Sequence, residues 1–248
     1  MSKLVLITGA SRGIGAATAL LAARQGYTVA VNYTANSLAA DDVVRQIRQA
    51  GGQAMTLQAD VSNEAQVVAM FEKIDARLGR LTALVNNAGI VDQTARVDAM
   101  TLRRLRRMFE INVFGSFLCA REAVKRMSTR YGGAGGSIVN VSSAASRLGS
   151  PGQYVDYASA KGAIDTFTLG LAKEVAAEGI RVNAVRPGII ETGIHASGGL
   201  PDRAREVAPQ VPMRRAGSAE EVAEAIVWLL GEGASYTTGA LLDVAGGR

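Results

Sequence analysis

Cysteine and histidine are almost missing from this chain of 248 residues, which has one of each, Cys119 and His195. A single thiol excludes a disulfide bond within the chain, and the two side chains are too few for a zinc site, so we expect no bound metal. Cys119 lies in a helix-like segment without a histidine at a fixed spacing. We therefore expect a buried structural thiol rather than a nucleophile.

Long apolar runs are also lacking. The longest stretches, such as 226–230, are much shorter than the roughly 20 apolar residues that a membrane-spanning helix requires. The first strand-like run begins at Lys3 and leaves no room for a signal peptide before it. We expect a cytoplasmic protein that does not contact a membrane.

Aromatic residues are scarce, at 5%, and an excess of basic side chains gives a net charge of +5. The densest basic run is 103–107, and no aromatic residue alternates with it. We interpret this run as a solvated helix face and expect no nucleic-acid partner. Attraction of an anionic ligand or partner is the alternative. Nucleic-acid binding would be recognised by a strong dependence on salt.

Apolar runs of strand length alternate with longer helix-like segments along the whole chain. The runs of strand length are Lys3–Thr8, Thr28–Asn32, Gln53–Gln58, Leu81–Asn86, Ser137–Ser142, Arg181–Val185 and Ala240–Val244. The helix-like segments begin near Gly13, Asn36, Asn63, Thr101, Tyr154 and Ser218. Strands that are apolar on both faces and are each followed by a helix are typical of a parallel sheet covered on both sides. The sequence therefore predicts an α/β fold: a Rossmann-type doubly wound, mostly seven-stranded parallel sheet with helices on both faces, in a single domain over residues 1–248.

A glycine-rich turn stands between the first predicted strand and the first predicted helix. It contains Gly9, Ser11, Arg12, Gly13, Ile14 and Gly15. Backbone N–H groups at a helix N-terminus bind phosphate, and glycine is needed where the chain turns sharply or approaches a pyrophosphate. The spacing G-x-x-x-G-x-G differs from the usual G-x-G-x-x-G, and such a turn can be purely structural. Its place between a strand and a helix nevertheless predicts a dinucleotide site.

Polar segments also follow the third and fourth predicted strands. Asp60 and Val61 follow the third strand, and Asn87, Ala88 and Gly89 follow the fourth. Each segment alone is consistent with an ordinary turn, because Asn, Asp and Gly favour turns. At successive carboxyl ends of strands, however, they lie where a doubly wound sheet binds its ligand.

Tyr157 and Lys161 are four residues apart in a predicted helix, so their side chains share one face. A tyrosine has a pKa of about 10, and a neighbouring ammonium favours the phenolate and lowers that pKa. Such a phenol can donate a proton to a carbonyl oxygen or accept one from an alcohol. A hydroxyl from Ser143 can polarise the same oxygen. The pattern Y-x-x-x-K alone is common by chance, so the surrounding motifs must show whether it is catalytic.

Taken together, these motifs resemble those of the short-chain dehydrogenase/reductase family over essentially the whole chain. The matching segments are Thr8–Gly15, Asp60–Val61, Asn86–Gly89, Ile111–Val113, Ser143, Tyr157 with Lys161, and Pro187–Thr192. Among its members, the chain resembles 3-oxoacyl-carrier-protein reductases and glucose dehydrogenases. The resemblance implies an NAD(P)-dependent dehydrogenase or reductase that acts on CH–OH or C=O groups.

The resemblance also implies a catalytic set. Tyr157 would be the acid/base, Lys161 would lower its pKa and bind the nicotinamide ribose, and Ser143 would orient the substrate oxygen. Asn112 would position a water molecule that links Lys161 to solvent. The interval from Ser143 to Tyr157 is slightly longer than is usual in the family, which leaves Ser142 as an alternative. The alignment of the preceding strand favours Ser143.

The cofactor contacts that the resemblance implies come from three places. Asp60 and Val61 would frame the adenine, and residues 87–89 would lie behind the adenosine ribose. The residues expected at the nicotinamide are Pro187, Gly188, Ile190 and Thr192.

The end of the second predicted strand indicates which dinucleotide is bound. An acidic residue commonly binds the adenosine ribose there in NAD-dependent enzymes, but this chain has Asn32, followed by Tyr33 and Thr34. Arg12 in the glycine turn is placed to meet a 2′-phosphate, and Ser11 or Thr34 would add a hydroxyl. A second basic residue beyond this strand is missing. We therefore predict a modest preference for NADP(H), with NAD(H) as the alternative.

The substrate pocket is expected from residues 91–96, 144–154 and 191–212, none of which carries a recognisable signature. Arg96, Arg147 and His195 are candidates for contact with an acidic substrate, and a solvated surface position is the alternative for each. We expect a small or acyl-linked ketone as the substrate. A catalytically idle NAD(P)-binding sensor is the alternative function, and the intact catalytic set argues against it.

Residues 166–172 carry no charge, and their apolar and small side chains lie on more than one face of the predicted helix. A helix that is apolar around most of its circumference must be covered on both sides. The resemblance supplies a symmetry-related copy of the same helix as the partner. We therefore predict a homotetramer.

Overall fold

The computed structural model describes residues 3–194 and 198–248 of the chain. The strands are β1 (Lys3–Ile7), β2 (Tyr27–Tyr33), β3 (Ala54–Gln58), β4 (Ala83–Asn86), β5 (Gly136–Val141), β6 (Ile180–Pro187) and β7 (Leu241–Val244). The described α-helices are α1 (Gly13–Arg24), α2 (Ser37–Gln49), α3 (Glu64–Arg77), α4 (Leu102–Phe109), α5 (Gly115–Met127), α6 (Ala145–Leu148), α7 (Val155–Val175), α9 (Arg203–Val207) and α10 (Ala219–Leu230).

The seven strands form one parallel sheet in the order β3-β2-β1-β4-β5-β6-β7. Val5 of β1 pairs with Val29 of β2 on one side and with Ala83 of β4 on the other. The chain is therefore wound outward from β1 in both directions, and the winding reverses between β1 and β4. Ligands of doubly wound sheets bind at the carboxyl ends of the strands beside such a switch point. The predicted fold class is confirmed.

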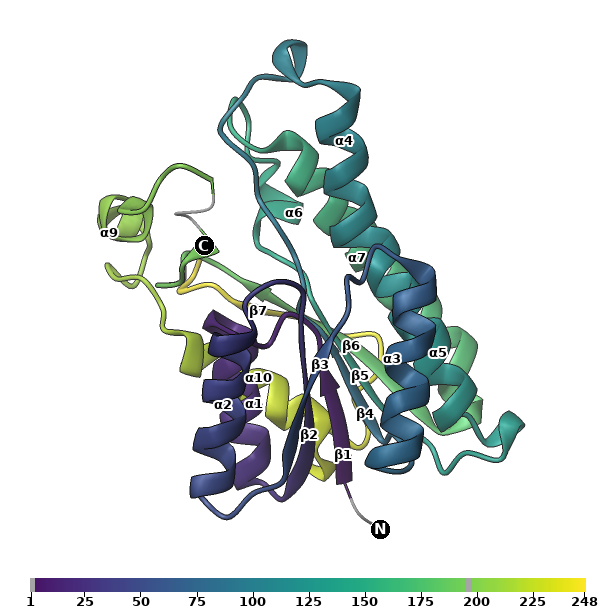
Figure 1. The fold of residues 1–248 in the computed structure, drawn as a ribbon. Coiled ribbons are helices and arrows are strands. Elements are labelled where there is room, and N and C mark those ends of the chain that lie inside the picture. Colours follow the sequence, from purple (N-terminus) through teal and green to yellow (C-terminus); the bar gives the residue numbers. More distant parts are fainter. Residues whose placement is uncertain (1–2, 195–197) are drawn as a thin grey trace.

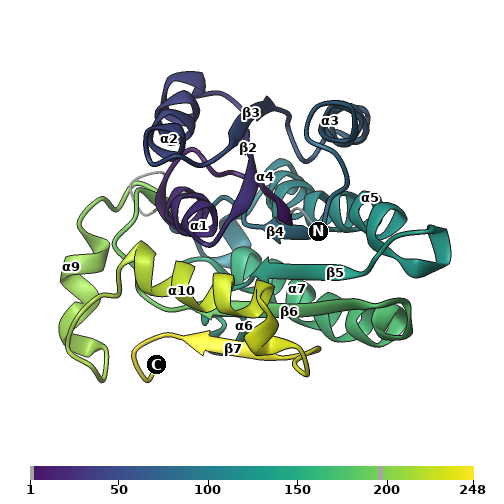
Figure 2. The same ribbon diagram turned by 90° about the horizontal axis from the view of Figure 1, so that it is seen from below.

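Helices cover both faces of the sheet. α1, α2 and α10 lie on one face, and α3, α5 and α7 lie on the other (Figure 1, Figure 2). Successive side chains of a strand point to opposite faces, so each strand contributes to two cores. Val5 and Ile7 pack into the core beneath α1 and α10, whereas Leu4 and Leu6 pack into the core beneath α3 and α5.

Polar residues begin four helices at the positions that the sequence indicates. The side chains of Asn36, Asn63 and Thr101 each accept a hydrogen bond from a backbone N–H in the first turn of α2, α3 and α4. Ser218 forms a capping box with Glu221 at the start of α10. By contrast, no side chain caps α1, whose first turn contains no acidic residue.

The helical segment after Thr101, which the sequence analysis treats as one helix, is interrupted. α4 ends at Phe109, a π-helical turn spans Glu110–Phe114, and α5 follows. Such turns occur frequently at functional sites because they redirect side chains within a helix. Here the turn contains Asn112, whose side chain is completely buried.

Two further expectations have opposite outcomes. Cys119 is buried, as expected, and burial raises the pKa of its thiol to about 12. The basic run 103–107 is not a fully solvated face, because Arg104 forms a largely buried ion pair with Asp156 at 2.7 Å. Its neighbours Arg103, Arg106 and Arg107 are exposed.

Across residues 3–194 and 198–248, no helix is long and apolar enough to cross a membrane, and no cluster of three potential metal ligands occurs.

Candidate active site

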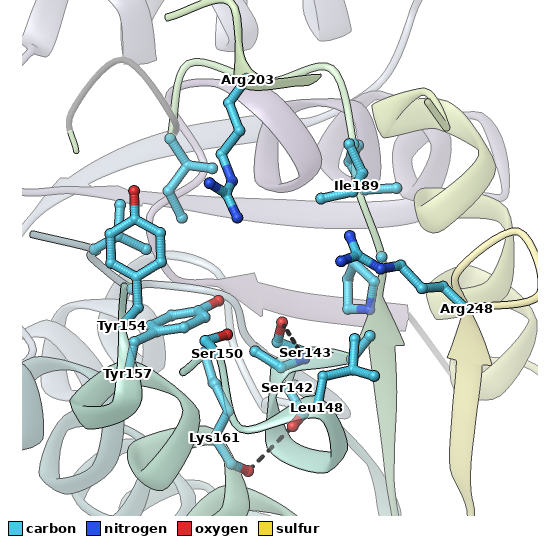
Figure 3. A pocket seen from close by; sticks show the side chains of 18 of the residues that line it. Ser142, Ser143, Leu148, Ser150, Tyr154, Tyr157, Lys161, Ile189, Arg203 and Arg248 are labelled. Atoms are coloured by element: carbon cyan, nitrogen blue, oxygen red, sulfur yellow. Dashed lines mark hydrogen bonds between the residues drawn. The ribbon is translucent and has the colours of Figure 1, made fainter. Parts of the chain in front are cut away.

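A cavity of about 550 Å³ lies at the carboxyl ends of β4, β5 and β6. Further walls come from the expected segments 144–154 and 191–212, whereas only Val91 of the expected segment 91–96 lines the cavity. Ile14 and Arg248, which were not expected, line it as well. The side chains of Ser143, Tyr157 and Lys161 lie together at this cavity (Figure 3). The predicted catalytic residues, which are up to 49 positions apart with Asn112 included, are thus brought to one region of the fold.

The glycine turn that joins β1 to α1 is shaped by close contacts. Gly9 has a φ angle of +61°, a left-handed conformation that favours glycine. A Cβ atom on Gly15 would lie 2.5 Å from Asn87 Nδ2 and 2.7 Å from the carbonyl oxygen of Gly9, so a larger residue would displace the turn. Together with the uncapped N-terminus of α1, this tight turn fits the pyrophosphate of a dinucleotide.

Thr8 and Asn87 attach the turn to the end of β4. Thr8 Oγ1 accepts hydrogen bonds from the backbone N–H groups of Asn87 at 3.0 Å and Ala88 at 2.9 Å. Asn87 Nδ2 donates to the carbonyl oxygens of Thr8 at 2.8 Å and Gly9 at 3.1 Å. The segment 87–89 therefore lies against the glycine turn, and the Asn87 side chain bonds to backbone within the protein.

The structure corrects the placement of Asn32 at the cofactor ribose. Its side chain is 1% exposed, with Oδ1 accepting from the N–H of Gly9 at 3.1 Å. Its Nδ2 donates to the carbonyl oxygens of Leu57 at 3.2 Å and Ala59 at 3.0 Å. Asn32 is thus a brace between the ends of β1 and β3. Because side chains alternate along a strand, the next residue, Tyr33, points to the other face and is partly exposed.

Asp60 and Val61 follow β3 as expected, and both make contacts within the protein. Asp60 Oδ1 accepts hydrogen bonds from the N–H and the hydroxyl of Ser62, at 2.9 and 2.7 Å. Val61 is buried and packs against Gly115 at the start of α5, where a Cβ would lie 2.7 Å from Val61 Cγ2. These contacts fix the turn after β3 beside the π-helical turn.

Asn112 and Lys161 approach each other on either side of Gly89. A Cβ on Gly89 would lie 2.8 Å from Asn112 Oδ1 and 3.5 Å from Lys161 Nζ. Asn112 Oδ1 also accepts from the N–H of Ile90 at 3.2 Å, and its Nδ2 donates to the carbonyl oxygens of Ile90 and Met108. The π-helical turn therefore attaches Asn112 to the segment that follows β4.

The two candidate serines have different surroundings. Ser142 is buried, and its hydroxyl donates to the carbonyl oxygen of Lys161 at 3.2 Å. Ser143 Oγ accepts from the N–H of Ala145 at 3.1 Å, and its side chain lowers the pKa of Tyr157, which the Ser142 side chain does not. These surroundings favour Ser143 as the residue that acts together with Tyr157.

The pKa of Tyr157 differs from the sequence-based expectation. Burial raises it to about 12, and the nearby Ser143 side chain only partly opposes this shift. Lys161 was expected to lower it, but Lys161 Nζ lies 5.6 Å from the centre of the Tyr157 ring and donates instead to the carbonyl oxygen of Val141 at 2.8 Å. Burial also lowers the pKa of Lys161 to about 8. In the protein alone, desolvation therefore dominates both groups.

The segment after β6 lies next to both the glycine turn and the cavity. Gly188 donates from its N–H to the carbonyl oxygen of Val244 at 3.0 Å, which fixes the end of β6 against β7. A Cβ on Gly13 would lie 3.4 Å from Thr192 Cγ2. Pro187, Gly188, Ile190 and Thr192 all line the cavity. His195 lies outside the described residues.

Comparisons with known proteins agree with this arrangement. A family model described as enoyl-(acyl carrier protein) reductase matches residues 9–248. The chain belongs to the short-chain dehydrogenase/reductase family. It is therefore an NAD(P)-dependent oxidoreductase that acts on CH–OH or C=O groups.

Similar members of this family cover nearly the whole chain. The uncharacterized oxidoreductase YgfF of Escherichia coli K12 is 62% identical over 245 residues, which are 99% of each protein. The cis-4-hydroxycyclohexanecarboxylate dehydrogenase of Sinomonas cyclohexanicum is 41% identical and covers 99% of this chain and 96% of its own. The crystal structure of a short-chain type dehydrogenase/reductase from Mycobacterium marinum aligns with a TM-score of 0.92 and 35% identity, over 99% of this chain and 94% of that one.

An ion pair beside Tyr157 of this short-chain dehydrogenase/reductase was missed in the sequence. Asp156 directly precedes Tyr157 and is completely buried at its carboxylate. Arg104 donates to that carboxylate from Nε at 2.7 Å and from Nη2 at 3.2 Å, and from Nη1 to the carbonyl oxygen of Gln93 at 2.6 Å. The pair attaches α4 to the first turn of α7. Its partners are 52 positions apart, so no local pattern indicates it.

Proposed function

We propose that this enzyme transfers a hydride between NADP(H) and a carbonyl compound or secondary alcohol, with Tyr157 as the acid/base. The observation that supports the proposal is that Ser143, Tyr157 and Lys161 line one cavity at the carboxyl ends of the strands (Figure 3). The comparisons give no support to the alternative, a catalytically idle sensor.

The raised pKa of Tyr157 suits the reduction of a carbonyl group. With a pKa of about 12 the phenol is protonated at neutral pH and is ready to donate its proton to the carbonyl oxygen. Ser143 would orient that oxygen, and Asn112 would position a water molecule that links Lys161 to solvent. The bound nicotinamide supplies the hydride, and its oxidised form adds a positive charge. In the reverse direction, positive charge near Tyr157 favours the phenolate that accepts the proton of an alcohol.

A panel of ketones and alcohols, followed by the absorbance of the reduced cofactor, tests the function. The panel includes neutral ketones, acyl thioesters and cis-4-hydroxycyclohexanecarboxylate, the compound in the name of the Sinomonas relative. We expect turnover of some members and none by the Tyr157→Phe variant. No turnover of any member by the unaltered enzyme, or turnover that survives this substitution, would overturn the proposal.

The preference for NADP(H) rests on Arg12 and on the lack of a carboxylate at the end of β2. Arg12 is the exposed residue directly before α1, and its Nη1 lies 3.3 Å from the position of a Cβ on Gly193. A charge-assisted hydrogen bond from Arg12 to a 2′-phosphate would contribute about ten- to a hundredfold in affinity. We expect Arg12→Ala to weaken NADP(H) binding by this factor and to leave NAD(H) binding nearly unchanged. Equal losses for the two cofactors in calorimetric titrations would contradict the assignment.

The homotetramer is supported by exposed apolar side chains on α5 and α7. Phe117 is 46% exposed and stacks on Phe167 at 3.8 Å between ring centres, while Leu169 is 41% exposed. Exposed aromatic and aliphatic side chains that gather on adjacent helices are typical of an interface between subunits. Light scattering at micromolar concentration checks the prediction, and a stable monomer would contradict it.

The single domain and the cytoplasmic location stay predictions.

A further inference from the structure

Two arginine side chains stand at the cavity opposite the catalytic residues. Arg203 of α9 and Arg248 both belong to its lining, and their guanidinium groups point inward in Figure 3. Lys161 is the third cation of the lining. Among the described residues, the lining contains no aspartate or glutamate side chain. The cavity therefore has a positive potential that no acidic side chain of its wall offsets.

Arg203 is held in place by neutral groups. Its Nη2 donates to Gln153 Oε1 at 2.6 Å, and its guanidinium carbon lies 5.4 Å from the centre of the Tyr154 ring. Tyr154 is itself buried, at 6% exposure. No ion pair of Arg203 is found within residues 3–194 and 198–248. Its fork of N–H donors is thus oriented in advance and still able to bind a carboxylate in a bidentate manner.

The two arginines that were expected to contact an acidic substrate form ion pairs within the protein instead. Arg96 pairs with Asp98 at 3.3 Å on the exposed surface. Arg147 pairs with Asp243 at 3.2 Å and donates to the carbonyl oxygen of Arg248 at 2.9 Å. Neither side chain lines the cavity. Arg147 instead fixes the backbone of Arg248, whose side chain does.

The cavity also has apolar walls. Val91, Leu148, Ile194 and Val207 contribute to them. Arg203 contacts residues 153 and 154, just before Tyr157 in the chain, rather than the glycine turn. An anion at Arg203 therefore lies on the substrate side of the site and not at the cofactor pyrophosphate.

We propose that the substrate is a ketone or secondary alcohol that carries a carboxylate at the far end of an apolar body, and that Arg203 binds this carboxylate. The proposal rests on the proposed function and names the substrate class for the same site. Arg248 strengthens the positive potential, and Gln153 with Tyr154 positions Arg203. The carboxylate bound at Arg203 orients the carbonyl oxygen toward Tyr157.

Matched pairs of acids and esters test this substrate class. The probes are 4-oxopentanoate, 5-oxohexanoate and 4-oxocyclohexanecarboxylate, each beside its methyl ester, which keeps the shape and removes the charge. One charge-assisted contact corresponds to about ten- to a hundredfold, so we expect kcat/KM for at least one acid to exceed that of its ester by this factor. Equal values for all pairs would overturn the proposal while leaving the proposed function intact.

Substitutions then locate the effect. Arg203→Gln should reduce the acid-to-ester ratio to near unity, and Arg203→Lys should leave an intermediate ratio because it keeps the charge but not the fork. Arg205→Gln is the matched control, since Arg205 is exposed on the same helix and does not line the cavity. It should keep the full ratio. An equal effect of both Gln variants, with unchanged melting temperatures, would contradict a specific role of Arg203.

A binding measurement separates this proposal from the proposed function. In the Tyr157→Phe variant loaded with NADP⁺, calorimetry compares 4-hydroxycyclohexanecarboxylate with its methyl ester without any turnover. We expect the acid to bind about ten- to a hundredfold more tightly, and Arg203→Gln to abolish the difference. No detectable binding of the acid, or equal binding of acid and ester, would overturn the proposal whatever the activity assays give.

Discussion

The two ends of the site use polar side chains in opposite ways. At the dinucleotide end, Thr8, Asn32 and Asn87 are bonded to backbone groups of the same region, so they shape the chain that the cofactor contacts. At the substrate end, the side chains of Tyr157 and Arg203 point into the cavity (Figure 3). The first end is a rigid backbone surface, and the second is a set of reactive and charged groups. Substitutions should therefore reduce stability at the dinucleotide end and turnover at the substrate end.

Tyr157→Phe should give the largest change and affect turnover alone. In the proposed mechanism the removed hydroxyl transfers the proton, and general acid catalysis contributes about a hundred- to ten-thousandfold. We expect kcat to fall by at least that factor, while the melting temperature and the dissociation constant of NADP(H) change little. A variant that also lost cofactor binding would show that the dinucleotide end and the substrate end do not function independently.

Lys161→Met tests an exception to this comparison. Lys161 belongs to the substrate end, but its buried ammonium group should lower the stability of the unaltered protein. Burial lowers the pKa of Lys161 from 10.5 to about 8. Between these values the unfolded chain binds a proton that the folded protein does not, so the free energy of unfolding rises with pH across this window. The rise amounts to about 3 kcal/mol for a shift of this size.

Unfolding in guanidinium chloride at pH 7.5 and pH 9.5 measures this rise. It should be smaller in Lys161→Met than in the unaltered protein. Lys173→Met, at an exposed lysine of the same helix, should keep the full rise. Tyr157 does not interfere, because its raised pKa acts only above about pH 10 and in the opposite direction. Identical pH dependence in all three proteins would contradict a buried, destabilising ammonium.

Asn32→Ala should change stability rather than turnover. The substitution leaves the N–H of Gly9 and the carbonyl oxygens of Leu57 and Ala59 without their partner. Unsatisfied buried groups of this kind cost about 2–4 kcal/mol in total. Asn36→Ala, which removes the cap of α2, is the matched control and should cost about 1 kcal/mol. Equal losses in denaturant unfolding would mean that Asn32 is not a brace.

Much of the architecture could be predicted because it depends on local patterns. All seven strands lie where apolar runs were found, and α2, α3, α4 and α10 begin directly after the expected residues Asn36, Asn63, Thr101 and Ser218. The interruption of the helix by the π-helical turn 110–114 was not predictable, because the sequence there keeps a continuous helical pattern. α6 and α9 were missed because they are only four and five residues long.

The sequence by itself determined the family, the order of the strands along the chain and the positions of the glycine turn and of Tyr157 with Lys161. These features depend on neighbours in the chain: period, capping residues, glycine at a positive φ, and a spacing of four on a helix. Only the tertiary structure decided that Asn32 is a brace, that the Ser142 hydroxyl is turned to the backbone of Lys161, and that Arg203 rather than Arg96 lines the cavity. It also decided the direction in which the pKa of Tyr157 moves. The reason is that burial and side-chain contact depend on segments about 20 to 50 or more positions apart, which meet only when the sheet is assembled.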